Sequence, residues 1–580
     1  MRTRAVCFIL LAATLMIASP SPARNQQSIF EEIRRDHEWI EKGLHNREAA
    51  RLLSQAFQAT AATAEQPLDV KHYRLQIRLD PDSPSLAGTV TIEGETRAPS
   101  TAISIDAEDN LIIDAVRLDG AARAFHRASD RVTINFSGPI PAGRAFNVAV
   151  DYHGVPVVAN RLGGGMLVAR HGPNNVVVMA SLSEPYAAPS WWPCIDDASD
   201  KATAEIEATV PKGYVAASNG VLVKTESNGN QAKTFFWRED YPLSTYLVSV
   251  AATNYEKFED TYTALDGTKM PLAYYVYPEH FELAQLKFAV TRRAMEIFAP
   301  LFGEYPFLNE KYGMAEFPWS GGMEHQTLTS LGGSVVGSLA SSNQSIIAHE
   351  LAHQWWGDLV TLRTWDDIWL NEGFATYSEI LFFERFSNLD PGELLSSSYD
   401  DGKMSGKLGG TVTAEDAADP FDDTGAVYRK GAFTLHMLRH VMGDQAFFDA
   451  LKDYRQRFAF SNASTKDFQQ VCEQHYGAAL DWFFSQWIYA RGRPFYKVST
   501  DIRPSEVSVT IKQKQSQEIP GRAESVYVMP VDLTIHYEDG SKETRVVKND
   551  ARKQTFTFNV SKRAVSVGFD EGRWILKKLR

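Results

Sequence analysis

The chain has 580 residues and a formal net charge of −13. At about 150 residues per domain, this length predicts three or four domains. Its hydrophobic content of 44% and charged content of 23% are those of an ordinary globular protein. The acidic balance argues against a protein that binds nucleic acid or an anionic membrane surface.

The first 23 residues are predicted to be a signal peptide. Arg2 and Arg4 precede an apolar run over residues 5–18, and small residues follow up to Ala23, where cleavage is expected. The run is shorter than a typical transmembrane helix. Cleavage would change the formal charge from −13 to −15. We expect an exported protein, periplasmic or secreted, without stable membrane insertion; an uncleaved anchor is the alternative.

Residues 24–66 are predicted to form a helical leader and a linker. Apolar residues such as Ile29, Ile33, Leu53 and Phe57 recur at helical spacing between charged ones. We expect this leader to pack on the main body of the protein, and a partner-binding helix is the alternative.

Residues 67–255 are predicted to form a β-rich domain, because the apolar period changes to two. The alternation is clear in 73–79 and 89–93, and Gly94 is expected to end the second of these strands. Two cysteines remain after residue 23, Cys194 here and Cys472 further along. They fall in separate predicted domains, so we expect buried free thiols and no disulfide framework.

Residues 256–493 are mainly helical in pattern, and residues 494–580 return to short strands. Helical periods begin near Glu279, and Ser464 with Asp467 predicts a capping box. The predicted fold class is therefore multidomain α+β, with a β-rich N-terminal domain, a mainly helical middle domain and a C-terminal β-sandwich-like domain.

A histidine motif in the helical region predicts a metal site. His349 and His353 are four residues apart, so on a helix they share one face and can bind one ion. Glu372 follows after 18 intervening residues and can supply a third ligand, which leaves a fourth position for water. Glu350, beside the histidines, can act as the base. Two histidines, one carboxylate and an open position are typical of a catalytic zinc centre, so we predict one Zn²⁺ per chain.

The alternative is a solvated helix with two surface histidines. Apolar residues flank the motif on both sides, including Trp355 and Trp356, and Glu372 lies in an equally apolar segment. Buried imidazole and carboxylate groups need a partner, and a metal ion is the partner that fits best.

A second motif lies about two dozen residues before the histidines. It reads Gly321-Gly322-Met323-Glu324-His325. Glycines let the backbone of a strand lie close to a ligand, and Glu324 offers a fixed negative charge beside it.

Taken together, these motifs resemble the M1 family of zinc aminopeptidases, gluzincins with a thermolysin-like catalytic domain. The resemblance runs from about Asp69 to Arg580. It rests on the glycine-Met-Glu strand, the zinc pattern with its spacing, the flanking Trp369-Leu370-Asn371-Glu372-Gly373-Phe374-Ala375, and Tyr428-Arg429-Lys430-Gly431-Ala432.

The resemblance implies a role for each of these residues. Glu350 takes the proton of the zinc-bound water and passes it to the leaving amine. Tyr428 donates a hydrogen bond to the oxyanion of the transition state. Glu324 and Glu184 hold the free α-ammonium of the substrate and would reject blocked N-termini. Glu379 either orients a ligand or is a solvated helix residue.

The chain departs from the family pattern at several positions. His325 replaces a common asparagine, and its imidazole could donate a hydrogen bond near the substrate and titrate near neutral pH. Leu182 and Pro189 replace a glutamine and an arginine, which weakens the match at Glu184. A β-rich 494–580 stands where longer members have a large helical domain, so we expect a more open site.

The sequence therefore predicts a zinc-dependent aminopeptidase that acts on peptides with a free N-terminus and has no nucleic-acid partner. Two alternatives remain. One is a zinc endopeptidase, and the other is a catalytically silent peptide-binding protein on the same fold.

Overall fold

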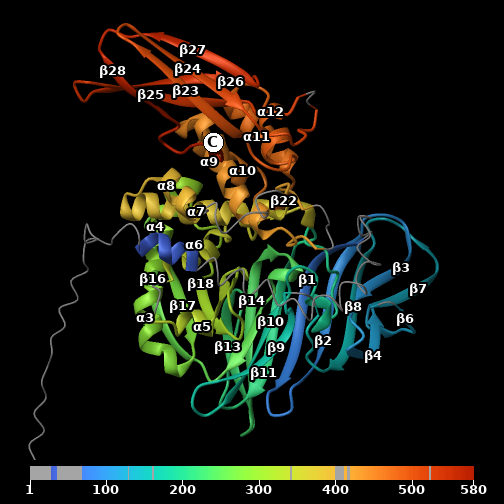
Figure 1. The fold of residues 1–580 in the computed structure, drawn as a ribbon. Helices are drawn as coiled ribbons and strands as arrows, with labels where there is room; N and C mark the ends of the chain where they lie inside the picture. Colours follow the sequence, from blue (N-terminus) through green and yellow to red (C-terminus); the bar gives the residue numbers. More distant parts are fainter. Residues whose placement is uncertain are drawn as a thin grey trace, which may run out of the picture.

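The computed structural model describes residues 28–35 and 68–579, except 129, 160–161, 340–342, 399–409, 415–418 and 522–523. The predicted signal peptide and most of the predicted leader lie outside these residues. Figure 1 shows β-sheets in the N-terminal part, helices in the middle and a second β part formed by the C-terminal residues. Within the described residues, no helix is both long enough and apolar enough to cross a membrane.

The N-terminal part is built on an eight-stranded sheet in which β1 is central, antiparallel to β2 and parallel to β11. In spatial order its strands are β13 (Val221–Asn228), β14 (Ala232–Leu243), β11 (Ala202–Pro211), β1 (Leu68–Asp80), β2 (Ser85–Thr96), β8 (Ala145–Gly154), β4 (Leu111–Leu118) and β5 (Ala121–Ala122). The alternation of buried and exposed residues along β1 and β11 explains the period of two in the sequence.

Two smaller sheets complete this part. One contains β3 (Ser100–Asp106), β7 (Arg131–Ile140) and β6 (His126–Ala128). The other contains β12 (Val215–Ser218), β15 (Val250–Thr253), β10 (Val176–Leu182) and β9 (Gly165–His171). In the chain, the short helix η1 (Ala188–Ser190) follows β10, and η2 (Thr245–Leu247) precedes β15.

The prediction that Gly94 ends a strand is wrong. Strand β2 continues to Thr96, and Gly94 pairs with Val70 of β1. A Cβ at Gly94 would overlap the carbonyl oxygen of Asp69 and the ring of Phe146. The glycine is therefore a point of close approach within a continuous strand.

The middle part begins with a five-stranded sheet. Its order is β16 (Glu256–Thr263), β17 (Lys269–Val276), β18 (Tyr312–Phe317), β20 (Leu328–Gly332) and β19 (Gly322–Met323). The helices are η3 (Pro278–His280), α3 (Phe281–Phe288), α4 (Val290–Phe302), α5 (Gly333–Val336), α6 (Gln344–Ala352), η4 (Trp365–Asp367), α7 (Trp369–Ser387), α8 (Pro391–Ser398), α9 (Gly431–Met442), α10 (Asp444–Arg457), α11 (Thr465–Tyr476) and α12 (Asp481–Trp487). Two short strands in this part, β21 (Val360–Leu362) and β22 (Ser461–Ala463), pair with each other in parallel.

Several further expectations are confirmed. The side chains of Trp355 and Trp356 are in the core, with exposures of 0% and 1%. Cys194 and Cys472 are free and buried. Ser464 and Asp467 form the capping box of α11. Tyr428 lies in a π-helical turn η5 (Gly425–Lys430) that leads directly into α9.

The described part of the leader is a helix over residues 28–35 that packs on the middle part. Ile29 and Ile33 are in the core, with exposures of 1% and 0%. The carboxylate of Glu32 accepts a hydrogen bond from the backbone N–H of Gln344, at the start of α6, at 2.8 Å. Figure 1 shows this helix in dark blue beside α6. Packing of these residues on the main body is therefore confirmed.

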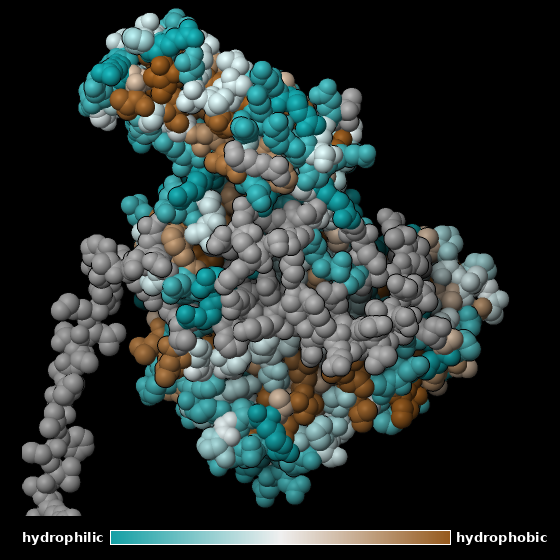
Figure 2. All heavy atoms as spheres, in the orientation of Figure 1, coloured by the Kyte–Doolittle hydropathy of each residue, from teal (hydrophilic) through white to brown (hydrophobic). Residues whose placement is uncertain are grey.

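The C-terminal part consists of two sheets that face each other. One contains β27 (Lys553–Asn559), β24 (Glu506–Gln513), β23 (Phe495–Arg503) and β29 (Lys578–Leu579), and the other contains β26 (Lys542–Asn549), β25 (Met529–Tyr537) and β28 (Ala564–Phe569). Tyr496 of the first sheet lies 5.2 Å from Phe569 of the second, centroid to centroid. Trp574 stacks on His436 and His440 of α9 and joins this part to the helices. Figure 2 shows a mainly hydrophilic surface with scattered hydrophobic groups over the residues it colours.

Candidate functional site

Two packed helices, α6 and α7, bring three potential metal ligands together. His349 Nε2 lies 3.2 Å and His353 Nε2 lies 3.4 Å from Glu372 Oε2. One donor atom from each residue lies within 4.8 Å of the others, and all three side chains are buried. Because the histidines are four residues apart on one helix, the local geometry follows directly from the helical period.

The second nitrogen of each histidine has a fixed partner. Glu379 Oε1 lies 2.8 Å from His349 Nδ1, and the carbonyl oxygen of Trp356 lies 2.9 Å from His353 Nδ1. These acceptors favour a proton on each Nδ1, so both Nε2 lone pairs point toward Glu372. Of the two roles considered for Glu379, the solvated one is wrong, since its exposure is 1%.

The donor set fits a zinc ion. Without a metal, burial by itself would raise the pKa of Glu372, but the protonated imidazoles of His353 and His349 lower it to about 2, so the carboxylate is charged. A zinc ion would displace the Nε2 protons and leave both imidazoles neutral. Two neutral imidazole nitrogens and one carboxylate oxygen are a common zinc-binding set. Two of the donors come from the α6 segment and the third comes from α7.

Glu350 lies against the glycine strand. Its exposure is 3%, and burial raises its pKa to about 8 in the absence of a metal, against the opposing effect of the two histidines. A Cβ at Gly322 would overlap the Glu350 carboxylate. The backbone of Gly321 is held by a hydrogen bond from Gly332 N–H at 2.7 Å, and Met323 is buried. Gly322 therefore creates the space that Glu350 occupies, whereas a Cβ at Gly321 would meet the ring of Trp319.

Two further glutamates approach the metal ligands. One carboxylate oxygen from each of Glu184, Glu324 and Glu372 lies within 4.8 Å of the other two. Glu184 and Glu324 have exposures of 6% and 3%. Burial, then the mutual repulsion of the carboxylates, raises the pKa of Glu184, and burial raises that of Glu324. Such a cluster of acids attracts a cation.

Tyr428 lies beside the metal ligands. Its ring stacks on His349 with centroids 6.0 Å apart and planes at 13°. Burial, then the carboxylates of Glu372 and Glu184, raises the pKa of Tyr428 well above its usual value, so the hydroxyl keeps its proton. The π-helical turn that carries Tyr428 is held by Lys430, whose Nζ donates to the carbonyl oxygens of Gly410 and Ala490.

The expectation that His325 titrates near neutral pH is wrong. The side chain is fully buried, its Nδ1 lies 2.8 Å from Ser330 Oγ, and burial lowers its pKa to about 3. His325 is therefore neutral in the folded protein. Among the described residues its Nε2 has no hydrogen-bond partner.

Sequence reasoning missed two buried residues near the site. Gln354, next to His353, contacts the segment that follows Glu324. Neither carboxylate oxygen of Asp358 has a hydrogen-bond partner among the described residues, and burial, then Glu324, raises its pKa so that it stays neutral. Both lie within five residues after His353, and this closeness to the motif was the available signal.

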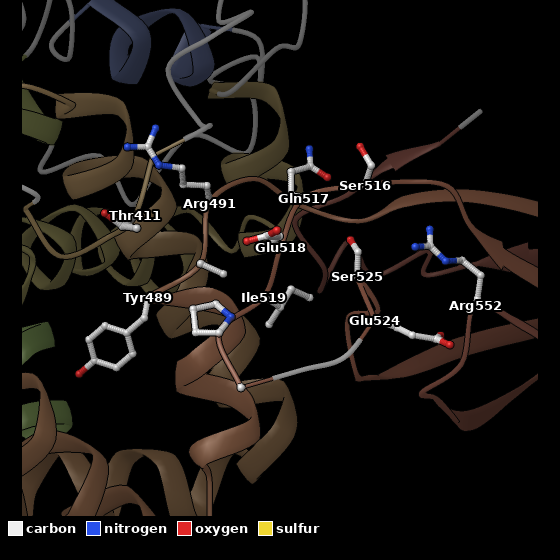
Figure 3. Close-up of a pocket in the computed structure, with 13 residues that line it drawn as sticks. Thr411, Tyr489, Arg491, Ser516, Gln517, Glu518, Ile519, Glu524, Ser525 and Arg552 are labelled. Atoms are coloured by element: carbon white, nitrogen blue, oxygen red, sulfur yellow. The ribbon is translucent and has the colours of Figure 1, made fainter.

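A cavity of about 1180 Å³ lies where the middle and C-terminal parts meet (Figure 3). Its lining includes Tyr489, Arg491, Gln517 and Arg552. None of the residues of the proposed metal centre lines it. Ala490, which lines the cavity, accepts a hydrogen bond from Lys430 of the turn that carries Tyr428.

The fold and this donor set define a zinc metallopeptidase with a gluzincin-like metal centre. The chain belongs to peptidase family M1, since residues 287–487 match the Peptidase family M1 domain and residues 69–247 match the Peptidase M1 N-terminal domain. The predicted family and fold class are thereby confirmed.

Several known proteins are similar to this chain. Aminopeptidase M1 of Arabidopsis thaliana is 30% identical over 494 residues, which cover 79% of this chain and 54% of that protein. Glutamyl aminopeptidase of Rattus norvegicus is 31% identical over 341 residues, or 56% of this chain and 35% of that protein. The chain thus spans about half the length, or less, of these relatives.

Solved structures share the fold. The M1 zinc metallopeptidase of Deinococcus radiodurans has a TM-score of 0.63 at 26% identity and covers 73% of this chain and 94% of its own. Legionella pneumophila aminopeptidase A, solved with aspartic acid, has a TM-score of 0.75 at 19% identity, covering 90% and 60%.

Proposed function

We propose that this protein is a zinc-dependent aminopeptidase that releases N-terminal residues from peptides. The observation that carries the proposal is the cluster of Glu184 and Glu324 against the metal ligand Glu372. A substrate ammonium held by these carboxylates would place the first peptide bond at the metal. The Deinococcus radiodurans relative was solved with a Tyr-Ser-Ala substrate, which is consistent with a peptide substrate here.

One zinc ion per chain would be held by His349, His353 and Glu372. When bound, it would supply Lewis-acid polarisation of the scissile carbonyl and of a water molecule. The donor set and the hydrogen bonds on both Nδ1 atoms support this assignment.

Glu350 would move the proton. Its carboxylate accepts a proton from the attacking water and returns it to the nitrogen of the leaving amine. Its buried position between Gly322 and the histidines supports this role. Tyr428 would donate a hydrogen bond where negative charge develops on the carbonyl oxygen, because its hydroxyl stays protonated in the site.

The two alternatives fit the geometry less well. An endopeptidase would have to pass an uncharged peptide segment over Glu184 and Glu324, two buried acids that suit a substrate ammonium better. A silent binding protein has no need for a base and a hydroxyl group directed at the same three ligands.

We also propose that the protein is exported and acts on peptides in the periplasm or outside the cell. The basic and apolar pattern of residues 1–23 supports export. The acidic charge of the chain speaks against a nucleic-acid partner.

A panel of aminoacyl chromogenic substrates tests the proposal. We expect hydrolysis that a chelator abolishes and zinc restores. In Glu350→Gln the rate should fall by several orders of magnitude. The wild-type protein should not hydrolyse N-acetylated versions of the substrates. Full activity of Glu350→Gln would refute the mechanism, and faster hydrolysis of the acetylated substrates would favour the endopeptidase.

A further inference from the structure

We propose that Thr327 and Glu239 are positioning residues that fix the distance between Glu324 and the metal ligands. The inference rests on the proposed function, in which Glu324 binds the substrate ammonium. It concerns a turn, residues 324–327, that joins β19 to β20.

Thr327 has an unusual backbone conformation. Its φ is 61°, in the left-handed region that β-branched residues rarely adopt. The residue is fully buried and lies three positions after Glu324. Such a conformation persists only where the surroundings hold it, so the contacts of Thr327 set the shape of the turn.

The N-terminal part holds one side of Thr327. Its hydroxyl accepts a hydrogen bond from Gly220 N–H at 2.7 Å and donates to Glu239 Oε2 at 3.0 Å. Glu239, in β14, is fully buried and also accepts from Gln326 Nε2 at 3.2 Å. Asn219 donates to the carbonyl oxygen of Gln326 at 2.6 Å. The turn is therefore fastened to a sheet outside the catalytic part.

The segment that follows α6 and the metal ligand His353 holds the other side of Thr327. The backbone N–H of Thr327 donates to Gln354 Oε1 at 2.9 Å, and Gln354 directly follows the ligand His353. Gln354 Nε2 also lies 3.4 Å from the carbonyl oxygen of Glu324. Lys311 Nζ donates to the carbonyl oxygen of Thr327 at 2.9 Å. Thr327 thus connects the N-terminal sheet, Glu324 and the metal ligands in one hydrogen-bonded unit.

This connection has a specific consequence for substrate selection. A peptide bond is cleaved only if the ammonium and the scissile carbonyl reach their sites together, so the spacing of the two sites decides which bond is cut. Loosening the turn would shift Glu324 without removing any metal ligand. The loss should fall on recognition of the amine and leave zinc binding intact.

Two inhibitors that differ in one group separate these effects. Leucine hydroxamate carries both the metal-binding hydroxamate and an α-amine, whereas 4-methylpentanoyl hydroxamate lacks the amine. In Thr327→Val, which removes the hydroxyl, we expect the inhibition constant of the amino compound to rise up to about tenfold, as for loss of one ordinary hydrogen bond. The constant of the desamino compound and the zinc content should stay as in the wild type.

Matched variants test the assignment further. Thr329→Val removes a hydroxyl in β20, just after the turn, that accepts from Tyr312 of β18 at 2.9 Å, and it should leave the ratio of the two constants unchanged. Thr327→Gly, which tolerates the positive φ but lacks the hydroxyl, should repeat the loss even if Thr327→Val folds poorly. Glu239→Gln keeps an acceptor oxygen, so its inhibition constant for the amino compound should rise less than that of Glu239→Ala.

The outcomes are distinct. Equal weakening of both inhibitors would overturn the inference. So would an unchanged ratio of the two inhibition constants in both Thr327 variants. If the wild-type protein hydrolyses no aminoacyl substrate and binds the two compounds equally, the proposed function itself fails.

Discussion

Replacing Glu379 with alanine should weaken zinc binding about 10- to 100-fold while the fold remains intact. Glu379 Oε1 lies 2.8 Å from His349 Nδ1, and the two side chains have exposures of 1% and 2%. A hydrogen bond to a charged group in such a setting contributes about 1.5–3 kcal/mol. Since about 1.4 kcal/mol corresponds to a factor of ten, this bond accounts for the expected range.

The assay is competition for zinc between the protein and a chromogenic chelator at fixed pH, with the melting temperature recorded in parallel. Glu379→Gln should lose less, because its amide oxygen can still accept from Nδ1–H. Glu384→Gln is the control, since Glu384 lies on the same helix but pairs with Arg439. Unchanged zinc affinity in Glu379→Ala would refute the reasoning that this carboxylate orients His349.

Three further predictions concern the same site. Tyr428→Phe should lower kcat about 10²- to 10³-fold with little change in KM, measured by steady-state kinetics, because the hydroxyl acts in the transition state; an equal rise in KM would contradict this. Gly322→Ala should reduce kcat strongly at normal zinc content, since the added methyl group overlaps the Glu350 carboxylate, and wild-type rates would exclude that overlap. His325 has a folded pKa of about 3, below its unfolded value, so its stabilisation is present at neutral pH and is lost as pH falls from about 6.5 toward 3. His325→Asn should therefore show a weaker fall in melting temperature over that range, and parallel curves for the two proteins would count against it.

Features that depend on short-range periodicity could be predicted from the sequence. The helical spacing of His349 and His353 and the capping box at Ser464 are local. The structure places His349 in α6 and His353 at its C-cap, and it forms the capping box at the start of α11. The β-rich first part follows from the alternation in β1. The family resemblance supplied what periodicity could not, namely that Glu184, Glu324 and Tyr428 belong to one site.

Features that depend on distant neighbours were missed or wrong. Gly94 looked like a strand breaker because its partner surface, Asp69 and Phe146, is remote in sequence. His325 looked titratable because its burial depends on the whole fold. A threonine with positive φ at position 327 contradicts local preference, and only its contacts with Glu239 and Gln354 explain it.

The hydrogen bond between Glu32 and the start of α6 has a consequence for the order of folding. The two residues are 312 positions apart, and the N-cap residue Asn343 makes no side-chain capping bond of its own. A helix of 9 residues is marginal in isolation, so its first turn gains this acceptor only after a long-range contact forms. During synthesis on a ribosome, Glu32 would emerge early, and its partner at the start of α6 would be made 312 residues later. We therefore expect the helix that carries both histidines to become fully ordered, and ready for zinc, late in folding.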